Sequence, residues 1–97
     1  MQLHVMHDVI FTLLFLEFSV MNDVEKKERL QALGRHIKSL RIKAGYTSHE
    51  DFANEHGFTM KQYWRLESGF DFKISTLLKL LDAHKVSYTD FFKDLNT

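Results

Sequence analysis

The sequence contains no cysteine and no proline, and it has only four glycines in 97 residues. Without cysteine, a disulfide framework and a thiolate metal site are excluded. The absence of cysteine is compatible with a reducing cytoplasm, where we expect the protein to act. Because proline and glycine are the residues least suited to helix interiors, their scarcity favours an almost wholly helical chain. A chain of this length can bury one modest core, built from its apolar side chains.

Signatures of catalysis and of cofactor binding are also missing. The sequence has no cysteine nucleophile, no glycine-rich phosphate loop and no recognisable pair of carboxylates. Ser48 and His49 are adjacent, so their side chains would not face each other on a helix. His4 and His7, three residues apart near Asp8, are a weak match to a metal site. We therefore expect no enzyme activity, no cofactor and no metal.

Neither sign of charge is in excess over the whole chain, because 13 basic residues balance 13 acidic ones. The distribution is nevertheless uneven. Between residues 24 and 65, nine Lys or Arg side chains stand against five Asp or Glu, a local excess of four positive charges. Because phosphate contacts provide the sequence-independent part of DNA affinity, this balance predicts modest, salt-dependent DNA binding. The alternative is that these charges form an ordinary solvated helix surface.

The spacing of apolar residues predicts five helices and an all-α fold. Their expected bounds are residues 24–44, 49–56, 60–68, 75–84 and 88–95. Gly45 should end the first of them as a left-handed cap. The last should contribute Phe91, Phe92 and Leu95 to the core. The other expected core residues are Leu33, Ile37, Leu40, Phe52, Leu66 and Leu77.

The most specific signal lies in the middle of the chain. Ser48 can cap one helix, with Asp51 three residues later in a capping-box arrangement, and Thr59 can cap the next helix. Gly57 supplies a turn between them, and Ala53 is small enough to let the helices approach closely. Two short helices joined in this way have the layout of a helix-turn-helix, whose second helix lies in the major groove of DNA.

Three motifs in this region occur in the order found in a known family. They are Arg41 four residues before Gly45, the Phe52-Ala53 pair followed by Gly57, and Thr59 leading through Tyr63, Leu66 and Glu67 to Gly69. This order resembles the XRE-type helix-turn-helix family, which includes lambdoid phage repressors and Cro proteins. The resemblance implies a five-helix repressor-like DNA-binding domain, here residues 24–97. It also implies an ion pair between Arg41 and Glu67 that fixes the orientation of two helices.

The expected DNA contacts combine helical periodicity with this resemblance. Tyr63 and Leu66 should face the core, and the resemblance places base contacts at Met60, Lys61 and Arg65. Cationic side chains suit guanine, glutamine suits adenine or a phosphate, and methionine suits a thymine methyl group. Phosphate contacts are expected at the start of residues 49–56, where the histidine should be exposed. The full set of candidate DNA-binding residues is Ser48, His49, Thr59, Met60, Lys61, Gln62, Trp64, Arg65 and Lys73.

Two departures from the family pattern accompany these matches. The segment between Gly45 and Ala53 is one residue longer than the commonest family spacing, which should lengthen the loop after the first helix. Trp64 stands where many members have a small polar residue. Of the aromatic residues that follow the second helix of the motif, Phe70 and Phe72 are expected to pack or to meet a partner.

Residues 1–23 form an apolar N-terminal extension that lies outside the resemblance. Residues 9–16 are apolar except for Thr12, and this stretch is too short to span a membrane, which needs about twenty apolar residues. The first eight residues carry no Lys or Arg, so the segment is a poor secretory signal. The triplet Met21-Asn22-Asp23 resembles a natural start. The preceding residues are therefore either an extension of the reading frame or an ordered helix that packs at a homodimer interface.

Two functions of different classes follow from the sequence. The favoured one is a sequence-specific transcriptional regulator, a repressor or autoregulator that binds palindromic double-stranded DNA as a homodimer. The alternative is a protein-interaction module, such as an antitoxin-like partner subunit, that docks through its N-terminal apolar segment. The locally basic charge and the ordered motifs favour the first function, whereas the neutral total charge and Trp64 favour the second.

Overall fold

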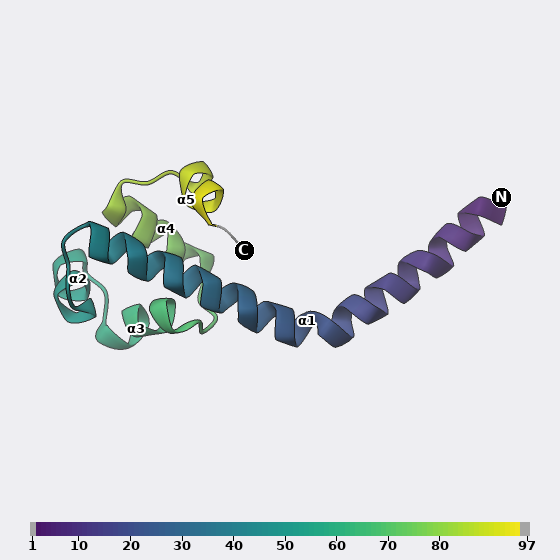
Figure 1. Ribbon diagram of the computed structural model, residues 1–97, viewed down its shortest axis with the longest axis horizontal. Coiled ribbons are helices and arrows are strands. Elements are labelled where there is room, and N and C mark those ends of the chain that lie inside the picture. The colour runs from purple at the N-terminus through teal and green to yellow at the C-terminus, as the bar shows by residue number, and fades with distance from the viewer. Residues whose placement is uncertain (1, 96–97) are drawn as a thin grey trace.

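The computed structural model describes the backbone of residues 2–95 and the side chains of residues 23–95. Within this range the chain forms five helices and no strand, which confirms the all-α class (Figure 1). The helices are α1 (Gln2–Lys43), α2 (His49–His56), α3 (Met60–Ser68), α4 (Ile74–His84) and α5 (Tyr88–Asp94). The predicted bounds of α2 and α3 are confirmed. α4 begins one residue earlier than predicted, and α5 ends one residue earlier.

The first helix is much longer than predicted. It begins at Gln2 rather than near residue 24, and it ends at Lys43, one residue before the predicted end. The physical reason is that no proline or glycine precedes Gly34, so the sequence has no strong signal to stop a helix there. Figure 1 shows α1 changing direction partway and its N-terminal part extending away from the other four helices. The helical state expected for this segment is confirmed, and a homodimer contact through it stays a prediction.

The short helices begin where side chains replace missing backbone partners. Ser48 Oγ accepts a hydrogen bond from the Asp51 backbone N–H at 3.2 Å, and Thr59 Oγ1 accepts one from the Gln62 N–H at 3.0 Å. Each cap satisfies a backbone donor that has no partner within its helix. α2 ends at His56 and is capped by Gly57, whose φ of 75° is the left-handed conformation that glycine adopts without steric cost. These local signals place the turn between α2 and α3.

The core lies where α1, α2, α3, α4 and α5 converge. Phe91 is buried as predicted, but the adjacent Phe92 is 49% exposed, which corrects its assignment to the core. Neighbouring side chains on a helix point about 100° apart, and on α5 it is Phe91 that faces the core while Phe92 is turned toward solvent. Leu33 and Leu40 are partly buried against the core. Its buried members are Ile37, Phe52, Ala53, Phe58, Tyr63, Leu66, Leu77, Leu80, Leu81 and Phe91.

In the part of the chain that the structure covers, none of the helices has an apolar stretch of the length that crossing a membrane requires.

Candidate nucleic-acid interface

The α2–turn–α3 unit is tied to α1 by a buried ion pair. Arg41 Nε donates to Glu67 Oε2 at 2.7 Å, and Arg41 Nη2 donates to Glu67 Oε1 at 3.2 Å. Both side chains are almost fully buried, and the hydrogen bond that Arg41 donates to Glu67 raises the pKa of Arg41 above its ordinary value. Arg41 Nη1 also donates to the Tyr46 carbonyl at 2.8 Å. The Arg41 guanidinium therefore connects α1, the loop that follows it and the end of α3. Its pairing with Glu67 confirms the prediction, whereas its contact with the loop was not predicted.

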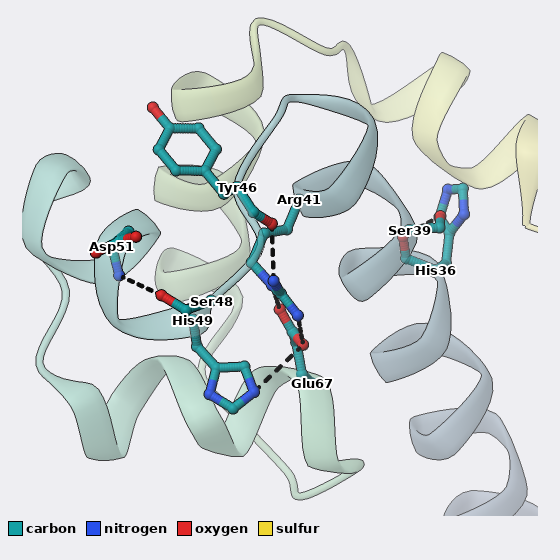
Figure 2. A network of polar contacts seen from close by, with 8 residues as sticks. All are labelled: His36, Ser39, Arg41, Tyr46, Ser48, His49, Asp51 and Glu67. Carbon is teal, nitrogen blue, oxygen red and sulfur yellow. Dashed lines mark hydrogen bonds and ion pairs between the residues drawn. The ribbon is translucent and has the colours of Figure 1, made fainter.

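His49 approaches the same carboxylate from α2. Its Nε2 lies 3.9 Å from Glu67 Oε1, and its ring centroid lies 6.3 Å from that of Tyr63. Figure 2 shows Arg41 and His49 converging on Glu67 from different helices. The sequence predicted an exposed histidine, but His49 is half-buried because the first turn of α2 packs beside the last turn of α3. A proton on His49 would place a second cation next to Glu67.

The outward face of α3 is formed as predicted. Tyr63 and Leu66 are fully buried, whereas Lys61 is exposed and Met60 is 41% exposed. Gln62, next to the helix start, is partly exposed. A helix of nine residues thus has one apolar side in the core and an opposite side available to a large ligand.

Arg65 leans away from that outward face toward the loop after α3. Its Nη2 donates to the Asp71 carbonyl at 3.3 Å, and its Cζ stands 5.0 Å from the centroid of the Phe70 ring. To contact guanine, Arg65 would have to give up both its hydrogen bond to Asp71 and its contact with the Phe70 ring. The loop itself is held to α1, because Lys26 Nζ lies 3.4 Å from Asp71 Oδ2.

Two aromatic side chains meet on the surface at this end of α3. Trp64 is 45% exposed and Phe70 is 44% exposed, and their ring centroids are 5.2 Å apart. The pairing of Trp64 with Phe70 was not predicted, because it joins a helix to a loop with no regular spacing. Phe72, by contrast, packs against the core, which was one of the two alternatives expected for it.

The remaining candidate residues lie at helix starts. The hydroxyl oxygens of Ser48 and Thr59 each accept a backbone hydrogen bond as helix caps. Each hydroxyl can still donate its proton to a DNA phosphate. Lys73 precedes α4, and its side chain is exposed. Of the nine candidates, five lie on α3, and the other four lie at the starts of α2, α3 and α4.

The electrostatics of the unit differ between its two helices. On α3 the cations Lys61 and Arg65 are accompanied by a single acid, Glu67, which is buried and paired. The first turn of α2 instead carries Glu50 and Asp51, both exposed. These two acids oppose the approach of a phosphate to the start of α2, so α3 is the more favourable surface for a polyanion.

Neither metal chemistry nor a known relative supplies a further clue. Among the described residues, no three His, Cys, Asp or Glu side chains are grouped as metal ligands would be. No family model, no curated protein and no solved structure matches this chain. Its function must therefore be inferred from its residues and their geometry.

Proposed function

We propose that the protein is a sequence-specific DNA-binding regulator of the XRE type, with α2 and α3 as its helix-turn-helix. The observation that carries the proposal is the two-sided character of α3. Its inward side chains anchor it in the core, and its outward side presents Lys61 beside the capped helix start. The pair of Arg41 with Glu67 holds α3 against α1, so the outward side chains are presented from a fixed support.

In this proposal α3 lies in the major groove and α2 crosses above it. Lys61 donates to guanine O6 and N7, and Gln62 contacts adenine or a phosphate. Arg65 either remains on Phe70 and orders the loop, or moves to a base or phosphate. The acids at the start of α2 reduce the phosphate contribution there, so we expect modest affinity with a strong dependence on salt.

We further propose that the regulator acts as a dimer in the cytoplasm, as a repressor or autoregulator. Two copies related by a twofold axis would place their α3 helices in half-sites about one helical turn apart on one face of the DNA. The N-terminal part of α1, which extends away from the other helices in Figure 1, is the proposed contact between copies.

The direct test is selection of binding sites from a random duplex library with the full chain, followed by titration of the selected duplex by fluorescence anisotropy. Lys61→Ala and Arg65→Ala should each weaken specific binding by about 1–3 kcal/mol while the helical circular dichroism is unchanged. Lys93→Ala is the matched control, because this exposed lysine lies on α5, which Figure 1 places on the opposite side of α1 from α3. Selection of no preferred sequence would contradict the proposal.

A protein-interaction module is the second candidate, and one observation favours it. Met60, Trp64 and Phe70 expose large apolar surfaces on or beside α3, and tryptophan and methionine are enriched in protein interfaces. This function predicts that the chain selects no duplex even at about 50 mM salt, where electrostatic DNA binding is strong. It also predicts a complex with a defined partner, such as the product of an adjacent gene, that Trp64→Ala weakens.

A further inference from the structure

The outward face of α3 carries an apolar ridge in addition to its cations. Met60 is 41% exposed and Trp64 is 45% exposed. The two residues are four positions apart, so they lie on the same side of the helix, separated by about 6 Å along its axis. That separation corresponds to roughly two base-pair steps of DNA, each about 3.4 Å.

The ridge is ordered before any ligand arrives. The Trp64 ring contacts Phe70 with centroids 5.2 Å apart, and the Arg65 guanidinium covers the Phe70 ring at 5.0 Å. Arg65 is in turn hydrogen-bonded to the Asp71 carbonyl, and Lys26 holds the Asp71 carboxylate to α1. Because these contacts already restrict the indole, less conformational entropy is lost when it meets a ligand.

The charges beside the ridge indicate the kind of surface it meets. Lys61 follows Met60 directly and Arg65 follows Trp64, while the acid of this helix, Glu67, is buried in its pair with Arg41. An apolar ridge whose charged neighbours on α3, outside the buried pair, are both cations is complementary to a polyanion that also offers apolar groups. In the DNA major groove the 5-methyl group of thymine is the apolar group that a base presents.

We propose that Met60 and Trp64 read thymine methyl groups about two base pairs apart, so that the preferred half-site is defined by thymines as well as by the guanine of Lys61. This inference rests on the proposed DNA-binding function and deepens it. The aromatic contact with Phe70 is the support that keeps the indole directed outward, and Arg65, which covers the Phe70 ring, helps to hold that support in place.

The test replaces each thymine of the selected duplex, one at a time, by deoxyuridine, which lacks only the methyl group. For the wild-type chain, we expect about a fourfold loss of affinity at each of two positions, the effect of withdrawing one methyl group from an apolar contact. Met60→Ala should abolish the loss at one position, and Trp64→Ala should abolish it at the other. Deoxyuridine outside the half-sites is the matched control and should have no effect.

The possible outcomes separate this inference from the function on which it rests. Sequence-specific binding that is indifferent to every deoxyuridine would overturn the methyl contact and leave the DNA-binding function standing. A loss that persists unchanged in both Met60→Ala and Trp64→Ala would assign the methyl contact to other residues and also overturn the inference. If no duplex is preferred, the proposed function itself fails, and the ridge becomes a protein-docking surface. Trp64→Phe keeps an aromatic ring on Phe70 and provides a second variant if Trp64→Ala does not fold.

Discussion

Gly34 in α1 lies directly against the backbone of Glu67 in α3. A Cβ atom placed on Gly34 would stand 2.5 Å from the Glu67 carbonyl oxygen and 3.1 Å from the carbonyl oxygen of Leu66. Carbon and oxygen atoms do not pack at the shorter of these separations, so only glycine allows the two helices to approach this closely. The side chain of Glu67 pairs with Arg41 on the same helix as Gly34. Backbone contact and ion pair therefore fix the position of α3 together.

Gly34→Ala should destabilise the fold by roughly 1–3 kcal/mol, the usual cost of overpacking a close contact. The sign is informative, because alanine at an exposed helix position would instead gain about 1 kcal/mol over glycine. The free energy of unfolding by urea measures the effect. Lys38→Ala, an exposed site on the same helix, is the control and should change it by less than about 0.5 kcal/mol. Unchanged or increased stability in Gly34→Ala would mean that α1 and α3 are further apart.

Arg41→Met should cost about 3–5 kcal/mol, because it leaves the buried Glu67 carboxylate without its guanidinium partner. The double variant Arg41→Met with Glu67→Leu should lose much less, since it removes both charges from the interior. A double-mutant cycle of denaturation midpoints provides the measurement. The cycle also needs the single variant Glu67→Leu, and a loss in the double variant equal to the sum of the two single losses would show that the two side chains are not coupled.

Local signals explain why α2 and α3 could be predicted to the residue. Ser48 and Thr59 form hydrogen bonds three residues along the chain, and Gly57 adopts its left-handed conformation within the turn. Each of these features depends on neighbours in sequence, so a one-dimensional pattern contains it. Arg41 and Glu67 were predicted to pair through the family resemblance rather than through spacing.

Features that depend on distant neighbours were not predictable in this way. Phe58 is buried although it lies between helices, where no periodicity marks it. The close approach at Gly34 and the contacts of Arg65 with Phe70 depend on how separate elements pack. A helix was expected before residue 21, but not its continuity with the next one, because the start-like triplet at residues 21–23 indicated a boundary and the sequence there has no proline or glycine that would break α1.

Leu66→Ala should destabilise the protein by roughly 2–5 kcal/mol, the range for removing a fully buried leucine. Lys61→Ala on the exposed side of the same helix should change stability by less than about 0.5 kcal/mol. Chemical denaturation of both variants compares the two sides of α3 directly. Similar denaturation midpoints for the two variants would mean that Leu66 is not buried and that the outward face of α3 is formed by other residues.

His84 should make the fold less stable as the pH falls below neutral. Its ring stacks on Phe52 with centroids 4.8 Å apart, and its Nε2 has no hydrogen-bond partner among the described residues. Burial lowers the pKa of His84, and the nearby His56 adds to this effect. The folded protein therefore keeps the imidazole neutral, while the unfolded chain takes up a proton near its ordinary pKa of about 6.5. This penalty is absent well above that pH, grows as the pH falls below about 6.5, and levels off below the folded pKa.

The variant His84→Phe keeps an aromatic ring against Phe52 and removes the titration. The free energy of unfolding, measured between about pH 7.5 and pH 5, should then fall less steeply than in the wild type. His49→Gln is the control. It leaves His84 in place, so the part of the pH dependence of stability that His84 causes should remain. A slope unaltered by His84→Phe would assign the pH dependence to other groups.

Removal of residues 1–20 should leave a folded domain with weaker self-association. Among the side chains that the structure describes, the buried core is formed by residues 37–91, and Figure 1 shows the N-terminal part of α1 extending away from the other helices. Sedimentation equilibrium of the full and truncated chains over one concentration range measures the change. Equal dimerisation of both would move the interface to another surface, and α5 is the first to examine because Phe92 and Tyr88 are exposed there. Loss of the helical signal on truncation would instead mean that the N-terminal part of α1 stabilises the fold, and the dimer contact would then have to be sought by point substitutions in the full chain.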